Sequence, residues 1–538
     1  MSNILPISNL KHIRSYNSKN SQDMLSDLRT NEVFVAIVGP AGSGVGTAAK
    51  ILQTFFNENK FQTEVIKVSE LIKSKASQQG LQVPEKGRKN LDNVKMMQDR
   101  GDEIRQGVLY GNEEDNSAVA RLILPAISSA RAKLQDEPFS NDAIIPNGNN
   151  RVFIIDSLRH PDEVSLLREV YQDAFSLIGI VCDPTEREKR IRENLFDRGL
   201  WAKPEVKQEV QNFLNRDENA EEKYGQHVSD TFYEADFFVD NTEKGSEDLA
   251  VTGMNEQLRR FVDLITQKSI ISPTISETAM HHARSSQMRS ACLSRQVGAV
   301  LVSSTGNIVA TGANDVPKAG GGLYGTSFEP DLLNDHRCAF RETKYCSSNK
   351  EQNNIIEELI DAFPILIDKD DKEKVIKQIR ATRLGGLIEF SRAVHAEMDT
   401  ILSASLTGVS PKGCRMYVTT YPCHYCARHI IAAGIDEVQF IEPYPKSKAT
   451  DLHEDAITIE SNGWIPPSQG GKQVLFRPFV GVAPRLYRRV FLKNRGYKDK
   501  ITGDFLLSPT SWGRPSETYK EPYFFMEISL SFGDKNDQ

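Results

Sequence analysis

Four residues of this sequence have the types and spacing of a catalytic metal site: His395, Glu397, Cys423 and Cys426. An imidazole and two thiolates are ligands that zinc prefers, and three protein ligands leave one tetrahedral position open for water. Zinc lowers the pKa of such a water from ~15.7 toward ~7, so hydroxide forms at neutral pH. We therefore predict a one-zinc hydrolytic site in which His395, Cys423 and Cys426 bind the metal. Glu397 is the catalytic proton carrier.

The elements predicted around these residues suit this chemistry. Residues 394–401 predict a helix that carries the histidine, and residues 415–420 predict a strand. Pro422 then starts a second helix that carries both cysteines, and a helix N-terminus stabilises thiolates. The alternative is a redox pair or half of a structural zinc knuckle. The whole pattern, His-x-Glu followed by Pro-Cys-x-x-Cys, is the signature of nucleobase and nucleoside deaminases.

Composition narrows the class of protein. A chain of 538 residues predicts two or three domains, and 39% hydrophobic with 26% charged residues is typical of a soluble globular protein. We find no apolar stretch of ~20 residues and no secretory signal in residues 1–20. The seven cysteines indicate thiols in a reducing cytoplasm. The net charge of −7 favours a free nucleotide over a polynucleotide as substrate. We expect a cytoplasmic protein with no membrane partner.

Patterning predicts an α/β chain with two main domains. Alternating strand and helix patterns in the first domain indicate a parallel sheet. The expected divisions are a polar tail (1–30), a nucleotide-binding domain (31–250), a linker helix (251–275), the zinc domain (276–500, with an insertion at about 318–389) and a C-terminal extension (501–538).

A glycine-rich loop follows the first predicted strand. The residues that form it are Gly39, Gly42, Ser43, Gly44, Val45, Gly46 and Thr47. Successive backbone N–H groups in such a P-loop cradle phosphate at a helix N-terminus. The stretch resembles the nucleoside monophosphate kinases, but Val45 stands at the lysine position and removes the point charge that steadies the phosphates. We predict a nucleotide ligand here. A regulator that no longer transfers phosphate is favoured over a working kinase, which stays open.

Two further segments resemble parts of a kinase. Asp156 ends a predicted strand and opens a segment similar to the one that follows the acidic strand end in that family. Four arginines recur along a predicted helix and its exit, as in a lid that holds phosphates: Arg187, Arg190, Arg192 and Arg198. The alternative is an exposed helix face whose arginines pair with neighbouring glutamates.

The second domain resembles the deoxycytidylate deaminase family over residues 277–446. The resemblance rests on residues 290–300, on Asn314–Asp315–Val316–Pro317 and on the zinc motifs. It implies a cytidine deaminase-like α/β/α sandwich with a mixed sheet, and hydrolytic deamination of a deoxycytidine nucleotide. It also implies that Asn314 and Tyr444 contact the substrate. A turn asparagine is the alternative for Asn314, and for Arg295 we expect a scaffold ion pair rather than a phosphate contact.

The insertion carries residues with the spacing of a second, structural zinc site: His336, Cys338 and Cys346. Some relatives carry a structural zinc in this region, and a fourth ligand is not obvious. The alternative is a charged insertion that contains two buried thiols.

A P-loop kinase-like domain fused to a deoxycytidylate-type deaminase resembles the bacterial anti-phage deoxycytidine nucleotide deaminases. The resemblance implies deamination of dCTP, dCMP or both, which depletes the deoxycytidine pool and starves phage replication. It also implies an inhibitory RNA as regulator and a homo-oligomer. Pyrimidine salvage is one alternative. Another is a polynucleotide editor, for which the candidate basic stripe is Arg485, Arg488, Arg489, Lys493 and Arg495.

Overall fold

The structure is a computed structural model. It describes residues 29–85, 90–107, 113–138, 144–218, 223–242, 247–267, 269–325, 335–363, 372–387, 389–442, 444, 447–493, 497–505, 523–524, 526–527 and 530. Most of the predicted polar tail, Arg495, and residues 326–334 and 364–371 of the insertion lie outside these ranges. So does most of the predicted C-terminal extension.

The chain divides into two compact units. Unit 1 combines residues 1–270 with 494–538, and unit 2 comprises residues 271–493. The predicted extension therefore groups with the first unit instead of standing apart. In the part of the chain that the structure describes, no helix is long and apolar enough to cross a membrane.

Unit 1 is built on a parallel sheet, as predicted. Its strands are β1 (Glu32–Val38), β2 (Gln62–Lys67), β3 (Arg151–Asp156), β4 (Phe175–Val181) and β5 (Phe237–Asp240), and they lie in the order β5-β4-β1-β3-β2. Every residue of β1 is buried, which explains its continuous apolar run, because helices cover both faces of such sheets. β1 and β3 pair from Glu32 opposite Arg151 to Ile37 opposite Asp156. The P-loop and Asp156 therefore emerge at the same edge of the sheet.

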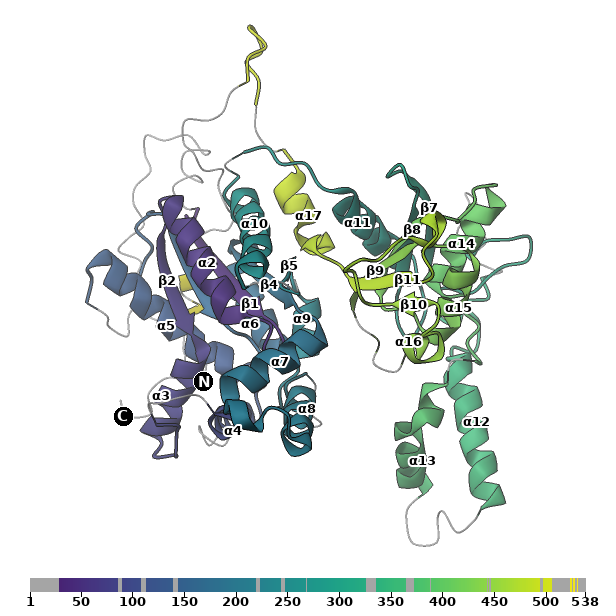
Figure 1. The fold of residues 1–538 in the computed structure, drawn as a ribbon, viewed down its shortest axis with the longest axis horizontal. Coiled ribbons are helices and arrows are strands. Elements are labelled where there is room, and N and C mark those ends of the chain that lie inside the picture. The colour runs from purple at the N-terminus through teal and green to yellow at the C-terminus, as the bar shows by residue number, and fades with distance from the viewer. Residues whose placement is uncertain are drawn as a thin grey trace. The chain divides into compact units, whose positions relative to one another are not determined.

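Helices surround this sheet (Figure 1). They are α2 (Val45–Glu58), α3 (Val68–Gln78), α4 (Leu91–Arg105), α5 (Ala118–Gln135), α6 (Pro161–Tyr171), α7 (Pro184–Leu195), α8 (Pro204–Glu218), α9 (Val228–Tyr233) and α10 (Glu247–Thr266), with short 3-10 turns at Gln172–Ala174 and Arg198–Leu200. The predicted linker helix is α10, and it packs against α2 and β5 as part of unit 1. Its buried Leu258, Phe261 and Val262 explain why it is not a free linker.

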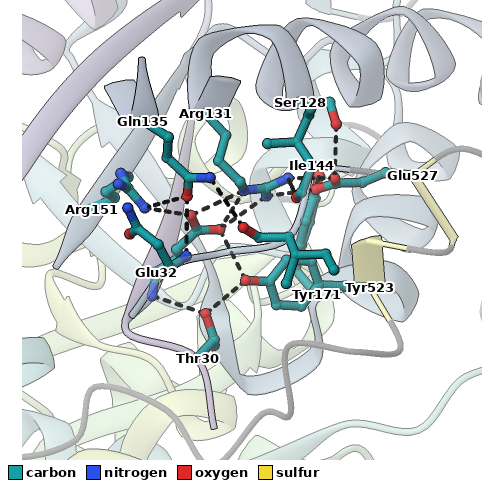
Figure 2. Close-up of polar contacts among 12 residues, drawn as sticks. Thr30, Glu32, Ser128, Arg131, Gln135, Ile144, Arg151, Tyr171, Tyr523 and Glu527 are labelled. Carbon is teal, nitrogen blue, oxygen red and sulfur yellow. Dashed lines mark hydrogen bonds and ion pairs between the residues drawn. The ribbon is translucent and has the colours of Figure 1, made fainter. Parts of the chain in front are cut away.

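The late residues of the chain complete unit 1 (Figure 2). Glu527 lies against Arg131 of α5, with Nη1 to Oε2 and Nη2 to Oε1 distances of 2.7 and 2.9 Å. Arg131 also pairs with Glu32 at the start of β1, at 2.9 Å. The Tyr171 hydroxyl donates to Glu527, and the Tyr523 hydroxyl donates to Glu32. All five side chains are buried, so this segment is an internal part of the unit rather than a surface appendage.

Unit 2 has a mixed sheet, as predicted for its class. Its strands are β6 (Gly298–Val302), β7 (Ile308–Ala313), β8 (Arg415–Thr420), β9 (Glu437–Glu442), β10 (Ile457–Thr458), β11 (Val474–Pro478) and β12 (Gly481–Val482). The first six form a six-stranded sheet in the order β10-β11-β9-β8-β6-β7. β6 pairs antiparallel with β7 and β8, whereas β8, β9, β11 and β10 pair in parallel.

The helices of unit 2 are α11 (Ile275–Gln287), α12 (Ser347–Ala362), α13 (Lys372–Ala381), α14 (Ala396–Leu406), α15 (His424–Ala432), α16 (Ala449–Leu452) and α17 (Pro484–Phe491), with 3-10 turns at Arg383–Gly386 and Pro467–Gln469. α12 and α13 lie side by side within the predicted insertion (Figure 1). They share a small core of Ile356, Ile360 and Val375.

A close contact between α14 and β7 fixes where the metal-binding helix begins. A Cβ atom on Gly312 of β7 would lie 2.4 Å from the Ala396 carbonyl oxygen and 2.3 Å from the Thr400 hydroxyl. Asp399 holds the same junction, because its Oδ2 accepts the Ala313 N–H at 3.0 Å. Glycine in the strand therefore lets the helix approach, and His395 and Glu397 are placed at its first turn.

Candidate metal centre

The histidine and the glutamate occupy the start of α14. His395 is the N-cap residue, in an extended conformation, and Glu397 lies in the first turn. The N-cap position turns the imidazole away from the helix body, whereas the Glu397 side chain is only 4% exposed. A carboxylate at the positive end of a helix dipole is in a favourable place.

Both cysteines lie at the start of α15. Cys423 is its N-cap residue, and Cys426 lies in its first turn. Because residues three apart share one face of a helix, the two sulfur atoms face the same point. β8 ends at Thr420, and the short Tyr421–Pro422 link delivers the helix. The predicted strand and cysteine helix are both present.

The three predicted ligands converge. His395 Nδ1 lies 3.3 Å from each of the Cys423 and Cys426 sulfur atoms, and all three ligand atoms lie within 4.8 Å of one another. Zinc–sulfur and zinc–nitrogen bonds of about 2.3 and 2.0 Å in tetrahedral geometry place such atoms roughly 3.5 Å apart. The donor set and its spacing therefore fit a zinc ion with one position left open.

Without metal, the cluster holds separated charges. The hydrogen bond from Cys426, together with His395, lowers the pKa of Cys423 to about 4. Burial opposes a charged imidazole, but the hydrogen bond with Cys423 and the charge of Glu397 outweigh it and raise the pKa of His395 to about 9. Burial raises the pKa of Cys426 well above its ordinary value. Without metal, the thiolate of Cys423 and the imidazolium of His395 thus face each other at the place where the three ligands would hold a zinc ion.

Glu397 is tuned for proton transfer. Burial, followed by the negative charge of Cys423, raises its pKa to about 7. A proton carrier is most effective when its pKa lies near the operating pH. Next to a metal-ligand set with an open position, this carboxyl can both accept a proton from water and donate one to a substrate.

Comparisons with known proteins identify the same part of the chain as a zinc-binding region. Residues 273–442 match the model for the cytidine and deoxycytidylate deaminase zinc-binding region. The deoxycytidylate deaminase of enterobacteria phage T2 is 30% identical over 176 residues, which cover 32% of this chain and 82% of the phage protein. This chain belongs to the deoxycytidylate deaminase family.

Other similarities are shorter or more distant. ComE operon protein 2 of Bacillus subtilis (strain 168) is 44% identical over 72 residues, 13% of this chain, and the chain spans 38% of that relative's length. A crystal structure of dCMP deaminase from the cyanophage S-TIM5 in complex with dCMP and dUMP is 17% identical, with a TM-score of 0.22, covering 39% of this chain and 99% of that one.

Within this deaminase-family domain, Asn314 is occupied by the backbone. Its Oδ1 accepts the Val297 N–H, and its Nδ2 donates to the Arg295 carbonyl, each at 2.5 Å. The residue is 7% exposed. Asn314 therefore shapes the segment from Arg295 to Val297, which agrees with the turn-asparagine alternative. Its contact with substrate stays a prediction.

Arg295 makes the expected ion pair. Its Nη2 lies 2.8 Å from Glu442 Oε2, and the Thr420 hydroxyl donates to the same oxygen. Tyr444 is half-buried near this pair; burial, followed by the charge of Cys423, raises its pKa. Tyr444 thus lies close enough to the metal ligands to sense their charge. Glu442 was not singled out from sequence, because it is an ordinary strand-end acid until the fold brings Arg295 beside it.

The predicted second zinc receives no support. Among the residues that the structure describes, His395, Cys423 and Cys426 are the group of three that gathers as metal ligands. Cys346 instead contacts the Ser294 hydroxyl, and Cys338 contacts Arg341. His336 packs against the Tyr324 ring. The spacing in sequence therefore does not translate into one ligand cluster, because each residue finds a different neighbour.

The P-loop prediction has the expected context, a strand followed by a loop and a helix. Gly44 is the N-cap of α2, with φ of 98°, a conformation that glycine adopts without cost. Asn241 at the end of β5 donates to the Ser43 carbonyl at 2.7 Å. Val45 stands at the lysine position, so the loop lacks the side-chain cation that handles the β- and γ-phosphates.

The four lid arginines do not act as one group. Arg190 donates to the carbonyl oxygens of Asn241 and Gly42, at 3.0 and 3.4 Å. Arg192 pairs with Glu188 along its own helix, and Arg198 lies over the Trp201 ring. The alternative of a helix face paired with glutamates thus describes Arg192. Arg190 has a different role, in bracing the P-loop from outside.

Proposed function

We propose that this protein removes the 4-amino group of free deoxycytidine nucleotides by zinc-dependent hydrolysis, acting on dCMP, dCTP or both. The observation that carries the proposal is the triangle of His395, Cys423 and Cys426 beside a buried Glu397 whose pKa is raised to about 7. A thiolate-rich site with an open position and an adjacent proton carrier is suited to hydrolysis. A sealed structural site has no use for Glu397.

The residues divide the chemistry between them. Zinc, when held by the three ligands, supplies a water of lowered pKa. Glu397 would accept one proton from the water as the water oxygen adds to C4 of the cytosine ring, and would pass this proton to the ring nitrogen N3. It would then take the proton of the new C4 hydroxyl and give it to the amino group, so that the C4–N bond breaks, ammonia leaves and C4 becomes the carbonyl carbon of the uracil nucleotide. The raised pKa of Glu397 suits both halves of this shuttle.

We further propose that the reaction serves antiviral defence by depleting dCTP, and that unit 1 regulates it as a nucleotide-binding domain. Support for the regulatory role comes from the P-loop, which has Val45 in place of its lysine but keeps a glycine N-cap at the start of α2. A cytoplasmic homo-oligomer and an inhibitory RNA complete the proposal. Housekeeping deamination of dCMP in pyrimidine salvage is the second candidate.

The deciding experiment incubates the purified protein with dCMP, dCTP and a cytosine-containing single-stranded DNA, and measures ammonia. We expect ammonia from the free nucleotides and none from the DNA. Glu397→Ala should retain zinc and lose at least 10²-fold in rate, the contribution of a general acid–base group. Ammonia from the polymer alone would make the protein an editor, and full activity in Glu397→Ala would remove this residue from the mechanism.

A separate experiment addresses regulation. The deamination rate is measured with and without added nucleotides, in the wild type and in Gly44→Asp, in which the new side chain would meet Asn241 Nδ2. A rate that responds to a nucleotide only in the wild type supports the regulatory role. Unchanged rates in both proteins exclude it.

A further inference from the structure

A buried carboxylate lies at the carboxyl edge of β1 and β3 in unit 1, where it contacts the P-loop. In open α/β sheets, ligands bind at the carboxyl ends of the strands, and here the P-loop follows β1 while Arg159 follows β3. Asp217, near the end of α8, reaches this place from a distant part of the sequence and is only 2% exposed.

Asp217 accepts hydrogen bonds from donors of the kinds that bind phosphate. Its Oδ2 accepts the Ala41 N–H of the loop at 2.7 Å. Its Oδ1 accepts from Arg159 Nη1 at 2.6 Å, and Gln98 Nε2 approaches the same oxygen at 3.4 Å. A loop amide and a guanidinium are the donors that bind phosphate. In this structure they hold a side chain of the protein itself.

Two further groups indicate a place built for a ligand. The Ser43 hydroxyl is fully buried within the loop and has no hydrogen-bond partner among the described residues. It points across the loop, because a Cβ on Gly39 would lie 2.4 Å from it. The Gln98 carbonyl oxygen beside Asp217 is also buried without a hydrogen-bond partner in the described part of the chain. Buried polar groups are usually hydrogen-bonded, so the Ser43 hydroxyl can still donate to a ligand and the Gln98 side-chain oxygen can still accept from one.

We propose that Asp217 is an internal substitute for a ligand phosphate. A nucleotide phosphate that binds the loop takes over the Ala41 amide and the Arg159 guanidinium, and thereby displaces Asp217. With Val45 in place of lysine, the loop has no side-chain cation of its own, so Asp217 and an anionic ligand compete for the one guanidinium of Arg159. The inference rests on the proposed nucleotide binding by unit 1 and describes how that binding acts: the phosphate displaces Asp217 and thereby releases the end of α8 from the P-loop.

The exchange has a defined structural consequence. Arg216, the neighbour of Asp217, pairs with Asp99 and Asp102 of α4 at 2.6 and 2.9 Å. These two ion pairs and the Asp217 contacts together hold the end of α8 against α4 and the P-loop. Displacing Asp217 removes the link to the loop and leaves the link to α4. We therefore expect α8 to loosen at the loop side when a nucleotide binds.

The test measures binding of radiolabelled ATP to the full chain by equilibrium dialysis. Asp217→Asn keeps the shape and an acceptor for the Ala41 N–H but removes the charge, and it should bind ATP at least tenfold more tightly than the wild type. Asp99→Asn is the matched control, because it removes a charge from the same ion-pair cluster without touching the loop, and it should bind as the wild type does. Arg159→Gln should weaken ATP binding, and the double variant Asp217→Asn, Arg159→Gln should not bind ATP more tightly than the wild type.

The outcomes separate the two proposals. If Gly44→Asp blocks ATP binding but Asp217→Asn binds no more tightly than the wild type, the role of Asp217 is wrong and nucleotide binding stands. If no protein shows ATP binding that Gly44→Asp removes, nucleotide binding by unit 1 fails. Hydrogen exchange of the wild-type protein tests the proposal even if one of the variants does not fold. ATP should slow hydrogen exchange in residues 40–48 and speed it in residues 204–218. Slower hydrogen exchange at the loop with no change in residues 204–218 would contradict the displacement of Asp217 by phosphate.

Discussion

At the scale of single residues, the metal centre combines three ligands with very different proton affinities. Cys423, with a pKa of about 4, is already a thiolate at neutral pH, whereas His395, with a pKa of about 9, still carries its proton. The pKa of Cys426 is raised by burial. Metal ligands must be deprotonated to bind, so zinc has to displace protons from His395 and Cys426 but not from Cys423.

Proton release on zinc binding should therefore be measurable at pH 7. We expect about two protons per zinc, one from each of His395 and Cys426, because both are protonated in the metal-free protein at this pH. Calorimetric titration in buffers of different ionisation enthalpy gives the number. Apparent affinity should fall as the pH is lowered from 9, since protons compete for His395. Binding without proton release would show that the charges of the empty site differ from those described.

Removal of the ligand that needs no deprotonation should be costly. Cys423→Ala leaves His395 and Cys426 as a two-ligand site, and we expect at least a tenfold loss of zinc affinity, measured by metal analysis after dialysis against a weak chelator. Cys414→Ala is the control, because Cys414 is buried in the core of the same unit and is absent from the ligand group. Equal zinc contents in the two variants would argue against the assigned ligand set.

At the scale of elements, the site depends on how closely α14 approaches β7. Gly312 permits that approach, since a Cβ there would lie 2.4 Å from a backbone oxygen. The Asp399 side chain fixes the same junction by accepting the Ala313 N–H. A displacement of the helix moves His395 and Glu397 together, because both lie at its first turn.

Gly312→Ala should thus affect both stability and metal binding. Forcing a methyl group into a packed site costs typically 1–3 kcal/mol, so we expect unit 2 to lose about 2 kcal/mol in urea unfolding and its zinc affinity to fall. Thr400→Ala in the same chain tests the cause, because it removes the hydroxyl that would lie 2.3 Å from the new methyl group but leaves the Ala396 carbonyl oxygen at 2.4 Å, so stability should recover only in part. Wild-type stability in Gly312→Ala would mean that α14 can retreat without cost.

The histidine at the N-terminus of α6 should make the stability of unit 1 depend on pH. His160 is its N-cap residue and its Nδ1 accepts the Asp162 N–H at 3.2 Å. Burial lowers the pKa of His160, with Glu163 partly opposing this. The unfolded chain, whose histidine titrates near 6.5, binds the proton first as the pH falls. The free energy of unfolding should therefore decrease below about pH 6.5.

His160→Asn separates capping from titration. Asparagine is a favoured N-cap residue, so the acceptor for α6 is kept while the titrating group is removed. We expect the melting temperature of unit 1 to depend less on pH between 5 and 7 in this variant. The exposed His336→Asn should leave the pH dependence as in the wild type. If the melting temperature of His160→Asn depends on pH between 5 and 7 as strongly as that of the wild type, groups other than His160 cause the dependence.

Local features were predictable from the sequence, and long-range partners were not. Cys423 and Cys426 converge because their spacing places both at one helix start, and the P-loop follows from a strand, a glycine run and a helix that are contiguous. Asp217 reaches Ala41, and Glu527 reaches Arg131, across 176 and 396 residues, and no pattern near either acid announces its partner. His336, Cys338 and Cys346 show the same limit, since their spacing in sequence alone does not fix which neighbours each of them meets.

At the scale of the whole molecule, unit 1 consists of two separated stretches of chain, with unit 2 between them in sequence. The late stretch contributes Glu527 to a buried cluster in which two carboxylates, Glu32 and Glu527, face Arg131 and Arg151 (Figure 2). Such a cluster is balanced only when every member is present. Loss of one charge leaves another unpaired in the interior.

Glu527→Gln should therefore destabilise unit 1 far more than a surface change of the same kind. Breaking a buried ion pair costs about 3–5 kcal/mol, whereas Glu209→Gln, which breaks the half-exposed pair with Lys95, should cost about 0–1 kcal/mol. Hydrogen exchange of β1 reports unit 1, and zinc content reports unit 2, which should be unchanged. Equal exchange in the two variants would exclude a structural role for the late segment.

The split composition of unit 1 also bears on how the protein is made. Domains usually fold in the order in which the ribosome delivers them, the N-terminal one first. Here residues 271–493 emerge as one uninterrupted stretch, whereas Arg131 and Arg151 share the single carboxylate of Glu32 until Glu527 is synthesised. The nascent chain can thus complete its metal-binding unit while the unit that begins it is still unfinished. Translation that stops early leaves a complete deaminase-family unit attached to an incomplete first unit.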